Sequence, residues 1–239
     1  PDQIKELLTA EKDTKAIFTT LCETSTGVTT DIEAVAKVVK ESDAVLVVDA
    51  VSGLGVTDLK TDAWGVDVVV SASHKGLMLP PGLAFVSASP KALKLIAASK
   101  SPRYYFDLRE AKKAMEKIDT PFTPAIGIVI ALNESLRRIK ETGLENHLAS
   151  IARLARATRA GAQGLGLTLF PHTSRISNAL TTISLPADID GEKLVKTMRD
   201  TYGISVAGGQ DKLKGKVIRI AHMGCIDEYD ILTGISCLE

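Results

Sequence analysis

The chain is poor in several features that mark specialised proteins. Its 239 residues include three cysteines (Cys22, Cys225 and Cys237), one Trp, four Tyr and five Phe. The cysteines are too far apart in sequence for a disulfide framework or a zinc pattern, and such usage is typical of a reducing cytosol. No apolar run reaches the roughly 18 residues of a membrane-spanning helix, and the first residues lack a signal-peptide pattern. We therefore expect a cytoplasmic protein with no membrane partner and no metal site.

An excess of one charge sign is also absent. Lys and Arg total 29, Asp and Glu total 29, and the formal net charge is +0 at pH 7. Such a chain has no long-range field to attract nucleic acid or an anionic membrane. Arg153, Arg156 and Arg159 recur at helical spacing, and we expect them on a solvated face rather than in a nucleic-acid site.

Apolar periodicity predicts alternating helices and strands in the first half of the chain. Helical spacing covers residues 4–9 and 31–42, and a further helix begins at Pro90. Strand patterns, most of them short and almost wholly apolar as in strands buried on both faces, cover residues 16–24, 45–50, 67–73 and 83–89. This order predicts an α/β fold in which helices cover a mixed or mainly parallel sheet.

The second half begins irregularly and then becomes regular. Residues 101–124 combine prolines with four aromatic residues, which is typical of a segment that lines a pocket or an interface, or of an anchored surface loop. The aromatic residues are Tyr104, Tyr105, Phe106 and Phe122. Helical patterns over 125–143 and 147–166 are followed by a strand–strand–helix–strand unit. We predict two domains, residues 1–150 and residues 151–239.

Two polar side chains stand at the ends of predicted strands. Asp49 ends one apolar run, and Lys75 lies on a tight turn directly after the next. The carboxyl ends of neighbouring strands converge on one crevice, so an acid and an amine are expected to meet there. Alone, such an Asp often caps a helix or binds magnesium, and a Lys in a turn usually faces solvent. No phosphate loop accompanies Asp49, and Gly53-Leu54-Gly55 lacks the third glycine of a dinucleotide fingerprint.

Four segments of the chain resemble one enzyme family. They are CETSTG (22–27), VDAVSG (48–53), SASHKGLMLPPG (71–82) and VIRIAHMGC (217–225). In order and approximate spacing they resemble the serine–pyruvate / alanine–glyoxylate branch of the class V aminotransferases. The resemblance implies a fold-type I transferase dependent on pyridoxal 5'-phosphate, with part of a large mixed-sheet domain followed by a small C-terminal α/β domain. It also implies a preceding N-terminal part with a glycine-rich phosphate loop and a ring-stacking aromatic residue.

Pyridoxal phosphate requires a lysine that bonds to it, an acid that faces its pyridine nitrogen, and donors for its phosphate. Lys75 and Asp49 are the expected catalytic residues for the first two roles. Ser73 and His74, directly before the lysine, are expected at the phosphate.

The resemblance implies four further roles. Thr24 is expected beside the phenolic oxygen of the cofactor, and Val51 against its ring. Thr123 is expected to reach the phosphate of the neighbouring subunit, which implies a homodimer with shared active sites. Arg219 matches an arginine that binds the substrate carboxylate. A cation in an apolar strand is unfavourable unless it pairs with an anion or extends to water from an edge strand.

These implications predict an aminotransferase that moves an amino group between a small amino acid such as serine or alanine and a 2-oxo acid such as pyruvate or glyoxylate. One alternative is a cysteine desulfurase-like lyase of the same fold, which needs an exposed cysteine. Cys225, next to a strand, is instead expected to be a small buried residue. The other alternative is an inactive fragment without cofactor. Trp64 is expected to pack within the fold rather than to stack on a cofactor.

Overall fold

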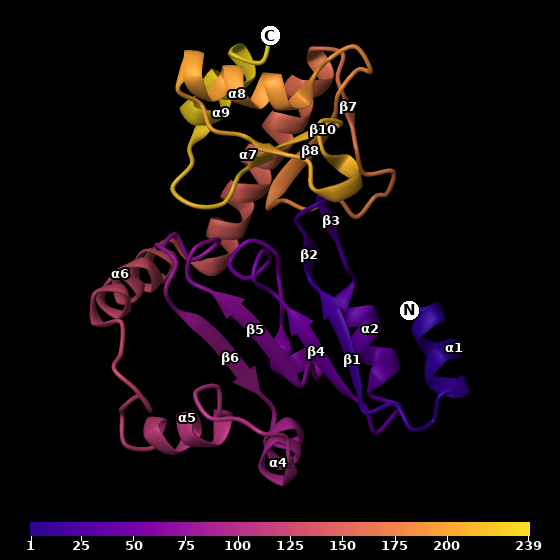
Figure 1. Ribbon diagram of the computed structural model, residues 1–239, viewed down its shortest axis with the longest axis vertical. Coiled ribbons are helices and arrows are strands. Elements are labelled where there is room, and N and C mark those ends of the chain that lie inside the picture. The colour runs from indigo at the N-terminus through magenta and orange to yellow at the C-terminus, as the bar shows by residue number, and fades with distance from the viewer.

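Each half of the chain builds its own four-stranded sheet in the computed structural model, which describes residues 1–239 (Figure 1). In the first sheet three strands run parallel, and the last is antiparallel to its neighbour. The strand order is β1 (Ala16–Thr20), β4 (Val45–Asp49), β5 (Val68–Ala72) and β6 (Ala84–Ala88). The predicted mixed sheet is confirmed.

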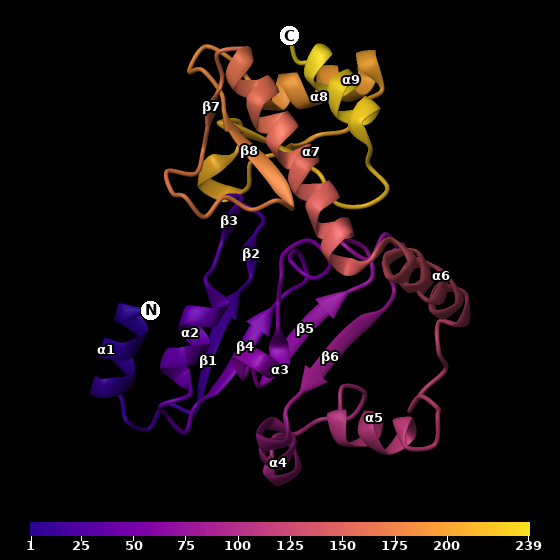
Figure 2. The same cartoon turned by 180° about the vertical axis from the view of Figure 1, so that it is seen from behind.

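Helix α2 supplies much of the apolar cover of this sheet. It follows Asp31, whose carboxylate accepts a hydrogen bond from the Ala34 amide at 3.0 Å and so caps the helix. Its buried face joins Leu46 in the largest apolar cluster, and Trp64 packs against that cluster as predicted. Figures 1 and 2 show α1 and α2 on the β1 side of the sheet. The helices of this region are α1 (Asp2–Ala10), α2 (Ile32–Val39), α3 (Thr61–Trp64) and α4 (Pro90–Ala98).

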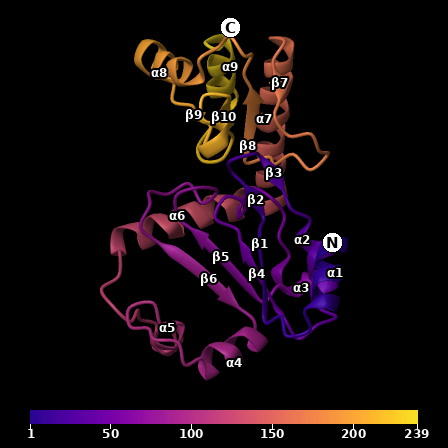
Figure 3. The ribbon, with the colours of Figure 1, turned by 45° about the vertical axis from the view of Figure 1, so that its right-hand side comes forward.

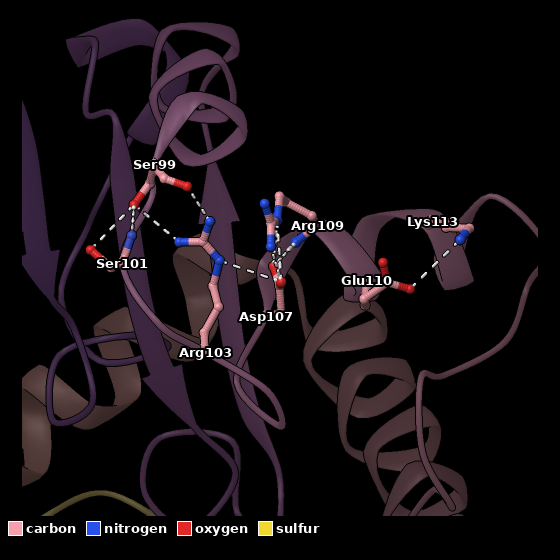
Figure 4. Close-up of polar contacts among 7 residues, drawn as sticks. All are labelled: Ser99, Ser101, Arg103, Asp107, Arg109, Glu110 and Lys113. Atoms are coloured by element: carbon pink, nitrogen blue, oxygen red, sulfur yellow. Dashed lines mark hydrogen bonds and ion pairs between the residues drawn. The ribbon is translucent and has the colours of Figure 1, made fainter.

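The segment 101–124 is partly helical, where the sequence predicted an irregular connection. It contains α5 (Leu108–Met115), which Asp107 caps by accepting a hydrogen bond from the Arg109 amide at 3.0 Å. The same carboxylate pairs with the side chains of Arg109 and Arg103 (Figure 4). The side-chain hydrogen bond from Arg109 lowers the pKa of Asp107 to about 2, so this helix cap keeps its charge at more acidic pH than an ordinary aspartate does.

The aromatic side chains of this segment gather on the surface. Tyr105 stacks on Phe122 with ring centroids 4.5 Å apart, and it meets Phe106 edge-on at 5.2 Å. Tyr104 lies edge-on to Phe122 at 6.1 Å. Tyr104 and Phe106 are 84% and 88% exposed. The four rings therefore pack on one another rather than into a core.

The second half confirms the predicted strand–strand–helix–strand unit. Helix α7 leads from the first sheet into this region (Figures 1 and 2). The second sheet is wholly antiparallel, with the order β7, β8, β10, β9. None of the helices of the chain is both long and apolar enough to cross a membrane. The elements are α6 (Ile126–Thr142), α7 (Leu144–Gly164), β7 (Thr168–Leu169), β8 (Leu180–Ser184), α8 (Gly191–Tyr202), β9 (Ala207–Gly208), a 3-10 turn (Asp211–Leu213), β10 (Val217–Ala221) and α9 (Glu228–Ser236).

A short hairpin connects the two halves. Strands β2 (Cys22–Glu23) and β3 (Val28–Thr29) reach from the first sheet into the second half, where Val28 bridges to Ile176 (Figure 3). The predicted boundary after residue 150 falls inside α7, and the division into two domains stays a prediction. Both halves contribute to one buried cluster, which contains Cys22, Val56, Ile151, Ala179 and Leu180.

One arginine of the predicted solvated face is not solvated. Arg153 and Arg156 are exposed on α7, but Arg159 is half-buried. Its Nη1 donates to the Ser177 carbonyl and its Nη2 to Asn178 Oδ1, both at 3.1 Å. Burial lowers the pKa of Arg159. The prediction was wrong for this residue because helical periodicity cannot show that the segment before β8 folds back over α7.

His222 is a fully buried histidine directly after β10. Its Nδ1 donates to the Asn178 carbonyl at 3.1 Å, and its Nε2 lies 3.1 Å from Thr181 Oγ1. Burial, with a smaller contribution from the Arg159 charge, lowers its pKa from 6.5 to about 4. The folded state therefore holds a neutral imidazole at neutral pH.

This histidine is expected to make the fold acid-sensitive. As the pH falls from about 6.5 to about 4, the unfolded chain binds a proton at this residue before the folded chain does, so about 3 kcal/mol of stability is lost. Urea unfolding at neutral and acidic pH would measure the loss. His222→Asn, which retains a donor for the Asn178 carbonyl, is expected to lose less stability over the same range. An equal loss in the variant and the parent protein would contradict this assignment.

Candidate active site

Two loops begin side by side at one edge of the first sheet. Strand β4 ends at Asp49, and the parallel strand β5 ends at Ala72, with Asp49 paired to Val70 in register. The loops that follow therefore start at the same carboxyl edge (Figure 1). The acid singled out in the sequence ends β4, and the lysine lies in the loop that follows β5.

The two loops touch through glycines. A Cβ added to Gly76 would lie 2.1 Å from the Leu54 carbonyl oxygen, far inside any allowed contact. Gly55 has a positive φ of 74°, and its Cβ would lie 3.2 Å from the Gly76 carbonyl oxygen. The approach at Gly76 excludes any side chain, and the positive φ at Gly55 favours glycine there. The turn that carries Lys75 is therefore fixed against the loop that follows Asp49.

Lys75 turns back over the neighbouring loop instead of extending into solvent. Its Nζ donates a hydrogen bond to Ser52 Oγ at 2.6 Å. Ser52 lies three residues after Asp49 and is only 6% exposed, and Lys75 is itself half-buried. The solvent-facing interpretation of a lysine in a turn is not what the structure shows.

Asp49 presents a carboxylate at the same edge. Its side chain is exposed, and Oδ1 accepts a hydrogen bond from the Val51 amide at 2.9 Å. Oδ2 has no hydrogen-bond partner in the chain, so it is free to accept a hydrogen bond from a bound molecule. Val51 is half-buried beside it.

Two helices hold the loops from outside. On α6 the buried Ser135 hydroxyl donates to the Leu77 carbonyl at 2.6 Å. On α7 His147 Nε2 donates to the Gly55 carbonyl at 3.1 Å. Each loop thus has its own helix contact, which restricts its conformational freedom.

The two residues expected at a phosphate differ in their surroundings. Ser73 is fully buried, donates to the Pro80 carbonyl at 2.7 Å and accepts from the Leu83 amide at 3.2 Å. These bonds close the turn between β5 and β6. To donate to a phosphate, the Ser73 hydroxyl would have to give up its bond to the Pro80 carbonyl. His74 is exposed and its ring has no hydrogen bond within the chain, so it is the freer donor of the two.

Arg219 comes to this edge from the second half of the fold. It lies on β10, an interior strand of the second sheet, which excludes the edge-strand explanation. Its Nη1 donates to the Thr24 carbonyl at 2.8 Å and its Nε to the Gly208 carbonyl at 2.9 Å. Burial lowers the pKa of Arg219, and the Glu23 carboxylate opposes that effect. The Thr24 contact connects the arginine to the β2–β3 hairpin.

Glu23 is a charged residue beside the candidate site to which the sequence interpretation gave no role. Its Oε1 accepts hydrogen bonds from the amide and the hydroxyl of Ser25, at 2.8 and 2.7 Å. These bonds lower the pKa of Glu23, and the charges of Arg219 and Lys75 lower it further. One carboxylate thus lies within electrostatic reach of both cations. An acid directly before the Thr24-Ser25 pair was the available signal.

Thr123 is not brought to these loops within the chain. It is exposed in the segment between α5 and α6, and its side chain forms no hydrogen bond. Its expected contact with a neighbouring subunit stays a prediction.

The prediction that Cys225 is buried was wrong. It is exposed, because β10 ends at Ala221 and the chain has already left the sheet at this position. Cys22 is the buried cysteine, with its Sγ 2.9 Å from Ser177 Oγ.

Comparisons with known proteins decide the family. The model of the family described as aminotransferase class-V matches residues 1–223. The chain belongs to this family. "Soluble hydrogenase, small subunit" of Synechococcus sp. (strain PCC 6716) is 42% identical over 242 residues, which cover 100% of this chain and 63% of that protein.

Other class-V relatives carry aminotransferase names. Serine–glyoxylate aminotransferase of Arabidopsis thaliana is 40% identical, over 94% of this chain and 57% of that protein. The solved alanine–glyoxylate aminotransferase of Nostoc sp. superposes with a TM-score of 0.95 at 28% identity, over 100% of this chain and 64% of that one. The chain thus spans less than two thirds of the length of each relative. The predicted family and the predicted fold class are confirmed.

The glycine contact is open to a direct test. Gly76→Ala is expected to lower the free energy of unfolding by about 2 kcal/mol, because the new Cβ would push the loops apart. Gly164→Ala is the matched control, since its Cβ meets nothing within 4 Å at the end of α7. Urea unfolding measures both. Equal stability of the two variants would show that the loops do not depend on this contact.

Proposed function

We propose that this protein is a pyridoxal 5'-phosphate-dependent aminotransferase that moves an amino group between a small amino acid and a 2-oxo acid. The observation that carries the proposal is that Asp49, at the end of β4, and Lys75, in the turn after the neighbouring β5, lie at one sheet edge. Arg219 supports it, because the charges of Arg219 and Lys75 both act on the Glu23 carboxylate. The class-V family supports the reaction type.

The side chains present fit the cofactor. Lys75 offers a half-buried primary amine, and Asp49 offers a carboxylate oxygen without a protein partner. The remainder of the cofactor would contact Thr24, Val51 and His74. Ser73 could donate to it only after giving up its hydrogen bond to the Pro80 carbonyl. When bound, pyridoxal phosphate supplies an electron-withdrawing ring that stabilises negative charge at the α-carbon of the substrate.

The protein side chains transfer the proton and bind the substrate carboxylate. Lys75 Nζ moves the proton from the substrate α-carbon, and the negative Asp49 keeps a proton on the pyridine nitrogen. Arg219 has Nε and Nη1 committed to backbone carbonyls, which leaves Nη2 free for a substrate carboxylate. The two carbonyl contacts fix the direction in which that nitrogen points.

The names of the relatives support the choice of substrates. Serine–glyoxylate and alanine–glyoxylate transfer in the named proteins supports serine or alanine as donor here and glyoxylate or pyruvate as acceptor. We further propose a cytoplasmic homodimer in which Thr123 reaches the cofactor phosphate of the neighbouring subunit. The wide spacing of the cysteines supports the reducing compartment.

One observation favours a second candidate. Cys225 is exposed, as a cysteine desulfurase-like lyase would require of its catalytic thiol. The two activities differ in their need for that thiol, since amino transfer uses none.

Incubation of the full-length gene product with pyridoxal phosphate is expected to produce the visible absorbance band of lysine-bound cofactor. Serine or alanine is expected to bleach the band while a 2-oxo acid forms, and glyoxylate is expected to restore it. Lys75→Ala is expected to lack the band because its side chain has no amine. A parent protein that shows no band and no 2-oxo acid would favour the inactive alternative.

Alkylation of the Cys225 thiol distinguishes the aminotransferase from the lyase. The aminotransferase rate is expected to survive alkylation of Cys225, whereas loss of activity together with sulfide release from cysteine would support the lyase.

Replacement of Arg219 separates substrate binding from cofactor binding. Arg219→Ala is expected to keep the absorbance band. It is expected to raise the KM for the amino acid by roughly 10- to 100-fold, because charge-assisted hydrogen bonds to the substrate carboxylate are lost. Arg219→Lys keeps the charge, and its KM for the amino acid is expected to lie between those of Arg219→Ala and the parent protein. Steady-state kinetics measures the change, and thermal unfolding checks that each variant is folded. An unchanged KM would remove Arg219 from the substrate site.

A further inference from the structure

Ser52 occupies a rigid position beside the site. The Gly53 and Leu54 amides both donate to the Ala50 carbonyl, at 3.1 and 2.8 Å, and close a tight turn around Ser52. A Cβ on Gly53 would lie 2.4 Å from the Leu21 side chain, so the turn is pressed onto the core of the first sheet. Its backbone therefore has little freedom to move the hydroxyl.

The hydroxyl of this serine is directed to the lysine. Ser52 is 6% exposed, and its Oγ accepts the hydrogen bond from Lys75 Nζ at 2.6 Å. The acceptor is neutral, although the carboxylate of Asp49 stands only three residues earlier, at the end of β4. A carboxylate at hydrogen-bond distance would form an ion pair and hold the amine in its charged form, whereas a hydroxyl orients it with a weaker bond.

We propose that Ser52 is a positioning residue that holds the Lys75 amine in place whenever that amine is not bonded to the cofactor. The inference rests on the proposed function, because a transaminase lysine is released from the cofactor in each turnover. A free lysine side chain has four methylene groups and loses up to about 2 kcal/mol of rotamer entropy when it is fixed. A rigid acceptor reduces the number of positions the amine samples, so it stays where it must take and return a proton.

A matched pair of variants isolates this contact. Ser52→Ala removes the acceptor, and Ser71→Ala removes a comparable hydroxyl from β5. Ser71 is 5% exposed, and its hydroxyl donates to the Ala50 carbonyl at 3.3 Å, whereas the hydrogen bond of Lys75 Nζ goes to Ser52. Ser52→Gly deletes the same acceptor by a second route, and Ser52→Thr restores a hydroxyl.

The first readout is chemical and needs no turnover. Cofactor-free full-length protein is treated with a trace of acetic anhydride, and mass spectrometry of its peptides gives the acetylation rate of Lys75. Without its hydrogen bond the amine is less restrained and less shielded, so Ser52→Ala and Ser52→Gly are expected to raise the rate at least about threefold. Ser71→Ala and Ser52→Thr are expected to match the parent protein.

The second readout is kinetic. Ser52→Ala is expected to lower kcat about tenfold with little change in KM, because proton transfer depends on the amine position and substrate binding does not. Ser52→Thr is expected to recover most of the rate. A Ser52→Ala protein with the Lys75 acetylation rate and kcat of Ser71→Ala would overturn the inference while leaving the proposed function intact. Absence of amino transfer in the parent protein would instead overturn the proposed function, and with it the role of Ser52.

Discussion

The site depends on one close backbone contact, where the loop after β4 meets the loop after β5. Gly76 lies against the Leu54 carbonyl with no room for a side chain, and Gly55 lies close to Gly76 with a positive φ that disfavours one. This contact turns the lysine inward and lets its amine reach Ser52. A parallel sheet brings two loop origins together, but their contact has to be built by the loops themselves. The contacts from α6 and α7 then hold each loop from outside.

The second half of the fold brings Arg219 to the β2–β3 hairpin beside this edge, over a long sequence separation. Arg219 reaches Thr24 because the β2–β3 hairpin extends to the second sheet, where a buried cluster shared by both halves holds it in place. The arginine is therefore oriented by backbone carbonyls rather than by a carboxylate. Its charge stays available to an anion from outside the chain, which is the arrangement a carboxylate-binding residue requires.

Much of this could be predicted from the sequence, because local periodicity determines most of the strands and helices. The position of Asp49 and Lys75 at one sheet edge also followed from strand order alone. Contacts made over long separations could not be predicted: the lysine–serine bond, the burial of Arg159 and the exposure of Cys225 all depend on where remote segments pack. Helix α5 was missed although Asp107 offered a capping signal, because the surrounding prolines and aromatic residues dominated the pattern.

The central claim is that one particular amine of this chain holds the cofactor. Borohydride reduction of the full-length protein with pyridoxal phosphate fixes the cofactor permanently to the lysine that carries it, and peptide mapping by mass spectrometry then identifies that lysine. The account predicts the added pyridoxyl mass on the peptide that contains Lys75 and on no other peptide. A label on a different lysine, or no stable label at all, would contradict it.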